Sequence, residues 1–271
     1  MTSSLMADKY RRGPDYRFGV DVDFSEVRTT FGLRAISVGR WVNNEERQRA
    51  ANLVYDALAD LTQILAVPPE VIGLRQSLTL AFAQGGRLGV QAHYQSSTRT
   101  LALAKNAGSG AFAHEWWHAF DHYISRFLFT GPTPQRAFAS KLWLSRNDYN
   151  EHRLNQPLLQ LLPHILLNEQ RTDSSAYLKR CALLDASAGQ YYLAMPEELS
   201  ARAFEHYVQN AEIKNQYLVS GTKQGELARL GAFPNDQEAA QLAPCFSRYF
   251  AALGSSISRA PKAIERSTKP Y

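Results

Sequence analysis

The apolar pattern of this chain changes period twice between residues 43 and 127, and this restricts the fold more than any other feature. Apolar residues recur at helical spacing over 50–65, alternate with polar or small residues in three later segments, and return to helical spacing over 111–127. The alternating segments are 78–82, 88–94 and 100–105. We therefore expect a helix, a meander of at least three antiparallel strands, and a second helix.

The ends of these elements carry start and stop signals. Asn43, followed three residues later by Glu46, predicts a capping box at the start of the first helix. Pro68 and Pro69 end that helix. Gly85-Gly86 predicts a turn between the first two alternating segments.

The remainder of the 271 residues gives a coarser prediction. Six helical candidates follow the second helix: 135–145, 157–169, 173–184, 196–211, 223–230 and 236–253. The fold class is α+β, a small antiparallel or mixed sheet followed by a mostly helical C-terminal half. The predicted parts are an irregular segment 1–40, a domain 41–254 with a helical insertion at about 131–190, and a polar basic tail 255–271.

Composition excludes several classes of protein. Two cysteines cannot build a disulfide scaffold or a structural zinc motif. No apolar run is long enough to span a bilayer and the first residues do not resemble a signal peptide, so we expect a cytoplasmic protein with no membrane partner. The net charge of +5 is spread along the chain and gives only weak support for a nucleic-acid partner.

Residues 114–118 read His-Glu-Trp-Trp-His, an H-E-x-x-H pattern inside the second helix. Its two histidines, His114 and His118, lie one turn apart on one helix face, so both imidazoles can bind one metal ion. Glu115 lies beside that face and can accept a proton from a metal-bound water, whose pKa zinc lowers to about 7. The pattern predicts one catalytic Zn²⁺ per chain, with Glu115 as general base.

A catalytic zinc needs a third protein ligand, which must come from elsewhere in the chain. His122 lies two turns from His114, about 12 Å along the helix axis, so one ion cannot bind both. The extended motif with a third histidine also fails, because Asp121 replaces its glycine and Ile124 its last histidine.

The best source of that ligand is the segment 196–207, where Pro196 suits the first turn of a helix. Glu198, Arg202 and Glu205 fall on one face of this helix, beside the small Ala201. The alternative is a solvated acidic first turn that the helix dipole favours.

The H-E-x-x-H-A-x-D segment with the downstream E-x-x-A-x-A-F resembles zincin metallopeptidases of the gluzincin type. It is similar to lethal-factor-like peptidases and to the zincin-like domain of large phage and plasmid polyvalent proteins. The resemblance covers residues 80–207. It implies that Glu198 is the third zinc ligand and that Tyr191 assists the carbonyl oxyanion. Arg202 stands where the lethal-factor-like pattern has a glutamate, a role that Glu205 could take.

We therefore expect a zinc-dependent peptidase that acts on a peptide or protein substrate. Asp121 is a further candidate, which could hydrogen-bond a ligand histidine or simply be a surface charge. The strand edge near 100–104 could align an extended substrate. The alternative is a non-catalytic binding or accessory protein with a zincin fold, which could be associated with mobile genetic elements.

Overall fold

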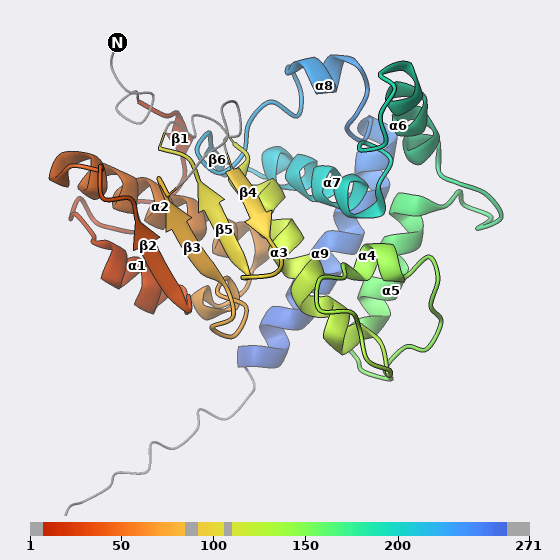
Figure 1. Cartoon of the computed structure of the whole chain (residues 1–271), viewed down its shortest axis with the longest axis horizontal. Coiled ribbons are helices and arrows are strands. Elements are labelled where there is room, and N and C mark those ends of the chain that lie inside the picture. The colour runs from red at the N-terminus through yellow and green to blue at the C-terminus, as the bar shows by residue number, and fades with distance from the viewer. Residues whose placement is uncertain (1–7, 85–91, 106–109, 259–271) are drawn as a thin grey trace, which may run out of the picture.

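The computed structural model describes residues 8–84, 92–105 and 110–258 (Figure 1). Its elements in chain order are β1 (Arg11–Arg12), α1 (Phe24–Thr30), β2 (Ala35–Val38), α2 (Asn44–Leu65), the 3-10 helix η1 (Pro69–Val71), β3 (Thr79–Phe82), β4 (Ala92–Gln95), β5 (Thr100–Leu103), α3 (Phe112–Leu128), α4 (Ala139–Leu142), α5 (Asn155–Leu166), α6 (Ala176–Ser187), α7 (Pro196–Asn210), β6 (Lys214–Asn215), α8 (Glu226–Arg229) and α9 (Asp236–Ser258). The predicted α+β class is confirmed. The four-stranded sheet and the first two helices lie on the left in Figure 1 and α5, α6 and α8 on the right, while α9 runs from the right to below the sheet.

Helix α2 begins and ends where the sequence predicts. The Asn43 side chain accepts a hydrogen bond from the Glu46 backbone N–H at 2.9 Å, and Glu46 Oε2 accepts one from the Asn43 N–H at 3.1 Å. Ala66 ends the helix in the left-handed region, with φ of 51°. The apolar face of α2 is buried in the main core, as its helical periodicity predicts.

The four-stranded sheet has the order β2-β3-β5-β4, so the predicted antiparallel meander is wrong in part. β4 pairs antiparallel with β5, as expected, but β3 pairs parallel with both β5 and β2. The chain passes from β3 to the outer edge of the sheet and returns through β5. The predicted turn at Gly85-Gly86 and the start of the segment 88–94 lie outside the described residues.

The burial of the central strands explains why the alternation of apolar and polar residues did not predict the strand order. The central strands β3 and β5 are buried over their last three residues, whereas β4 alternates between buried and more exposed residues. Central parallel strands are covered on both faces, so their sequences carry little information about which neighbour lies on which side.

Both predicted terminal segments also need correction. The segment 1–40, expected to be irregular, contains α1 and the edge strand β2. The Asp23 side chain caps α1 by accepting from the Glu26 N–H at 2.8 Å. At the other end, α9 continues to Ser258, past the expected start of the polar tail at 255.

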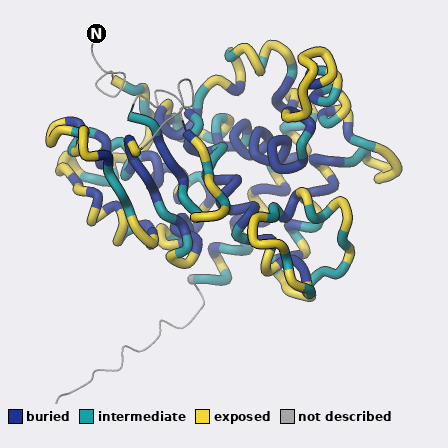
Figure 2. Tube along the Cα trace, in the orientation of Figure 1, coloured by how far each residue is buried: buried dark blue, intermediate teal, exposed yellow. Residues whose placement is uncertain are grey.

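Helix α3 lies between the sheet and the C-terminal helices, since it contacts β4 and β5 on one side and α7 on the other. Trp116 and Trp117 fill this position and are almost fully buried. The Trp117 ring stacks on Phe204 of α7 with centroids 4.7 Å apart, and its Nε1–H donates to Ser200 Oγ at 2.9 Å. Figure 2 shows that α7 is dark blue over most of its length. The buried aromatic cluster therefore fixes α3 against α7.

The predicted insertion contains α4, α5 and α6, and α5 packs against both α7 and α9. Among the described helices, none has both the length and the apolar character needed to cross a membrane.

Candidate metal centre

The start of α3 is held by the chain that follows β6. The Ala113 N–H donates to the Leu218 carbonyl oxygen at 3.0 Å. Gly110 precedes the helix with φ of +80°, and a Cβ at this position would lie 2.0 Å from the Ser220 nitrogen. Only glycine fits this close approach, so the backbone fixes where the H-E-x-x-H turn begins.

His114 and His118 face each other on α3, as the one-turn spacing predicts. Their Nε2 atoms are 3.1 Å apart. Glu198, in the first turn of α7, reaches both rings: its Oε2 lies 3.2 Å from His114 Nε2 and its Oε1 lies 3.3 Å from His118 Nε2. The ligand atoms of the three residues all lie within 4.8 Å of one another. This group could bind a metal ion.

The geometry of the three residues fits a tetrahedral ion. Zinc ligands at 2.0–2.1 Å in tetrahedral geometry are about 3.3–3.4 Å from one another. The two histidine Nε2 atoms are 3.1 Å apart, His114 Nε2 is 3.2 Å from Glu198 Oε2, and His118 Nε2 is 3.3 Å from the other carboxylate oxygen, Oε1. Glu198 Oε2 is also buried without a hydrogen-bond partner among the described residues, as is His118 Nδ1. Unpartnered buried polar atoms are costly, and a bound cation would offset the cost at Glu198.

Charge balance in the group changes the pKa of two of its members. Burial alone would lower the pKa of His114, but the neighbouring Glu198 and Glu205 carboxylates outweigh it and raise this pKa to about 10. Burial would raise the pKa of Glu198, yet the two histidines hold it well below its usual range. The two carboxylates thus favour a protonated His114 when no metal is bound, and metal binding would release that proton.

Arg202 lies directly behind Glu198 and is only 2% exposed. Its Nη1 is 3.6 Å from Glu198 Oε2, its Nε–H donates to the Ala232 carbonyl at 2.9 Å, and its Nη2 donates to the Leu193 carbonyl. Arg202 therefore ties the start of α7 to the loop before it. The sequence showed this residue only as a departure from the lethal-factor-like pattern.

Asp121 does not hydrogen-bond a histidine among the described residues. Its carboxylate accepts from both the N–H and the Oγ–H of Ser140, at the start of α4. Burial raises the pKa of Asp121 to about 6, although these two bonds and His118 oppose the rise. Asp121 thus anchors α4 beside the metal centre and influences His118 only through its charge.

Glu115, the predicted general base, is half-buried beside the three ligand candidates. Its Oε2 accepts a hydrogen bond from the Tyr94 backbone N–H at 2.6 Å. Tyr94 belongs to the edge strand β4, so the sheet edge holds this carboxylate. No local pattern predicts this contact, because it joins residues from different elements.

The two tyrosines before α7 differ in their surroundings. Tyr191, to which the resemblance assigns the oxyanion role, is 71% exposed, and Tyr192 is 47% exposed. Burial raises the pKa of the Tyr192 phenol far above its usual value, and the nearby Glu198 and Glu115 carboxylates raise it further. Tyr192 is thus the less exposed of the two tyrosines and lies within electrostatic reach of the Glu198 and Glu115 carboxylates.

Residues 184–257 match a known family, described as large polyvalent protein-associated domain 1. The matched segment contains α7, α8 and most of α9, and hence Glu198 and Glu205 but not α3. The chain is thus similar in part to a polyvalent-protein-associated domain. None of the curated proteins matches it, and none of the solved structures does.

Proposed function

We propose that this protein is a zinc-dependent peptidase with a zincin-like arrangement of its active site. The observation that carries the proposal is the convergence of His114, His118 and Glu198 within 4.8 Å, from helices 80 residues apart in sequence, with Glu115 next to them. Three protein ligands leave a fourth tetrahedral position for water, whereas structural zinc sites use four protein ligands.

Each residue of the centre has a defined role in the proposed hydrolysis. Bound zinc would supply a water of lowered pKa, near 7. Glu115 would accept a proton from the attacking water as the water oxygen adds to the carbonyl carbon of the peptide. As the C–N bond breaks, Glu115 passes this proton to the leaving nitrogen, which departs as an amine. The Tyr94 N–H orients Glu115 by holding one carboxylate oxygen.

Tyr192 is the residue we propose for the carbonyl oxyanion, in place of Tyr191. Its phenol lies within electrostatic reach of Glu198, and a donor there could stabilise the negative charge that develops on the carbonyl oxygen. Donors of this kind contribute about 2.7–4 kcal/mol to transition-state stabilisation in other hydrolases.

The substrate would lie along β4 rather than along the predicted edge at 100–104. Residues 100–103 form β5, which is an interior strand with neighbours on both sides. Among the described strands, β4 is the edge of the sheet next to the metal centre, and an extended peptide can add to it as a further strand. Such a peptide passes close to Glu115, since Tyr94 of this edge bonds to it.

The alternative is a binding or accessory protein of the kind found with polyvalent proteins. The observation that favours it is the family match over residues 184–257. In that case the centre would bind metal without turning over a substrate, and Glu115 would have no chemical role.

The Glu115→Gln variant separates the two functions. Glutamine keeps the shape of the side chain but cannot accept the proton of the water. We expect zinc-loaded wild-type protein to cleave members of a peptide library, Glu115→Gln to bind zinc without cleavage, and the exposed Glu45→Gln to cleave like wild type. Cleavage by Glu115→Gln, or none by the zinc-loaded wild type, contradicts the peptidase proposal.

A further inference from the structure

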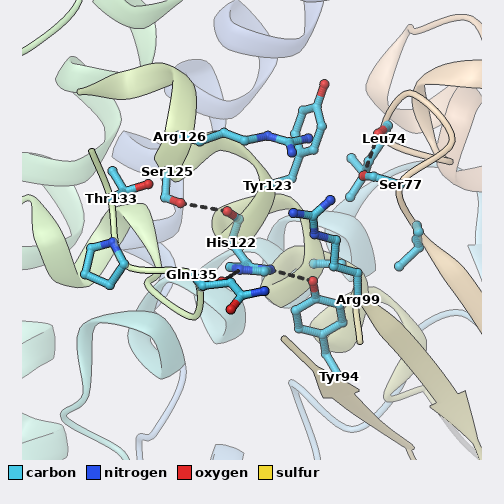
Figure 3. A pocket seen from close by; sticks show the side chains of 13 residues that line it. Leu74, Ser77, Tyr94, Arg99, His122, Tyr123, Ser125, Arg126, Thr133 and Gln135 are labelled. Atoms are coloured by element: carbon cyan, nitrogen blue, oxygen red, sulfur yellow. Dashed lines mark hydrogen bonds between the residues drawn. The ribbon is translucent and has the colours of Figure 1, made fainter. Parts of the chain in front are cut away.

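A cavity of about 250 Å³ lies between the C-terminal half of α3 and the end of the sheet where β4 turns into β5 (Figure 3). His114, His118 and Glu198 do not line it. Its walls come from Tyr94 of β4, from Arg99 in the turn to β5, and from His122 to Arg126 of α3. The cavity is therefore distinct from the metal centre, although both contact β4 and α3.

Two arginines give this cavity its charge. Arg99 and Arg126 both line it, and neither forms an ion pair with a carboxylate of the described residues. In contrast, Arg11, Arg146 and Arg180 each pair with an aspartate or glutamate.

The residues that the structure does not describe include few carboxylates that could neutralise these two arginines. The ranges that the structure does not describe contain one acidic residue, Glu265. Arg126 lies over the Tyr123 ring at 4.7 Å and the Phe127 ring at 4.9 Å, contacts that leave its charge uncompensated.

The cavity wall formed by Tyr94 and His122 carries no charge. His122 Nε2 lies 2.7 Å from the Gln135 carbonyl oxygen, which can only accept, so Nε2 carries the proton. His122 Nδ1 then accepts the hydrogen bond from the Tyr94 hydroxyl at 2.7 Å. Burial, together with the charges of Arg99 and Arg126, lowers the pKa of His122 and keeps the ring neutral. Among the residues that line the cavity, the positive charge is thus carried by Arg99 and Arg126.

The turn between β4 and β5 fixes the backbone of Arg99 beside the cavity. Arg99 has φ of 54°, as is usual for a residue at the end of a short turn between antiparallel strands. Its carbonyl oxygen accepts from the Thr79 N–H at 2.9 Å, which ties this turn to β3.

We propose that this cavity binds a small oxyanion, the phosphate or carboxylate group of a ligand, through Arg99 and Arg126. Guanidinium groups bind both kinds of group with charge-assisted hydrogen bonds. The volume is below the roughly 300–1,000 Å³ of pockets for drug-sized ligands, so it admits a single anionic group with a short stem. Tyr94 and His122 would form the neutral wall beside it.

Calorimetric titration with inorganic phosphate and with succinate tests this proposal and separates the two anion sources. We expect saturable binding of at least one of them to wild-type protein, with the same affinity after the metal is removed by a chelator. The double variant Arg99→Gln/Arg126→Gln should bind at least tenfold more weakly. Arg47→Gln is the matched control, because Arg47 is an exposed arginine far from the cavity. Its neighbour Glu46 pairs with Lys105, which follows the end of β5 opposite Arg99.

Binding of phosphate alone identifies a phosphate ligand, and binding of succinate alone a carboxylate. Absence of saturable binding of both to wild type overturns the proposal, as does unchanged affinity in the double variant. Should the double variant fail to fold, Arg126→Gln alone provides the comparison, because this side chain is exposed. If wild type binds the anion and Arg126→Gln binds it with the same affinity, the anion site lies elsewhere and the proposal is overturned.

Discussion

Glu205 Oε2 lies 3.1 Å from His114 Nδ1, on the opposite side of the ring from the Nε2 that faces His118 and Glu198. A carboxylate at this place accepts the Nδ1 proton, fixes the tautomer, and leaves Nε2 free for a metal. Glu205 is therefore the carboxylate placed to orient His114.

Glu205→Ala should weaken zinc binding by about 10–100-fold, because it removes the carboxylate that orients a ligand ring. Competition with a chromophoric chelator measures this affinity. The exposed Glu212→Ala is the control and should bind zinc like wild type. Equal affinities for Glu205→Ala and wild type would show that this contact has no role in the centre.

Glu198→Ala should weaken zinc binding by more than about 100-fold, because it removes a ligand. Loss of a residue that only hydrogen-bonds a ligand typically costs about 10–100-fold. Its neighbour Glu197 is also buried, but its carboxylate lies near Lys141, at 3.4 Å from Nζ. Glu197→Ala is therefore the control and should keep the zinc site. The same competition assay compares the two, and a stronger loss in Glu197→Ala would reverse the ligand assignment.

Tyr192→Phe should lower the rate of peptide hydrolysis by about 10²–10³-fold while zinc affinity stays unchanged, because it removes an oxyanion donor. Tyr191→Phe should have a much smaller effect, since Tyr191 is mostly exposed. Steady-state kinetics on a cleaved peptide measure both. The opposite order would return the role to Tyr191.

Asp185 stabilises the loop that leads into α7. Its buried carboxylate accepts the backbone N–H groups of Tyr192, Leu193 and Ala194 at 2.8–3.0 Å. Burial would raise the pKa of Asp185, but these bonds lower it below the ordinary value. Asp185→Ala should cost about 1–3 kcal/mol of the free energy of unfolding at pH 7.

This cost should depend on pH in one direction. A carboxyl whose folded pKa is lowered contributes stability above its unfolded pKa of about 3.9 and loses it as the pH falls through the folded pKa. Urea unfolding at pH 7 and near pH 3 should therefore show a difference between wild type and Asp185→Ala that shrinks at the lower pH. A difference independent of pH would mean that the charge of Asp185 does not matter.

Local patterns in the sequence predicted much of this structure. The period of 3.6 and the caps predicted α2 and α3 within one or two residues, and helix geometry placed His114 and His118 together. The exclusion of His122 also agrees with the structure, where this ring bonds Tyr94 and the Gln135 carbonyl instead. These features depend on residues close in sequence, for which spacing fixes geometry.

Features that depend on packing between elements could not be predicted. The order of strands follows from how the chain passes from β3 to β4, which alternation does not encode. Whether Tyr191 or Tyr192 faces the centre depends on the turn that Asp185 holds, and this aspartate had no distinguishing motif. The cavity of Arg99 and Arg126 likewise brings together a turn and a helix that carry no shared pattern.

The zinc content of purified, untagged protein, measured by elemental analysis, tests the central claim most directly. The convergence of His114, His118 and Glu198, whose ligand atoms lie within 4.8 Å of one another, predicts one zinc per chain. A zinc content well below one per chain that added zinc does not restore would contradict the account.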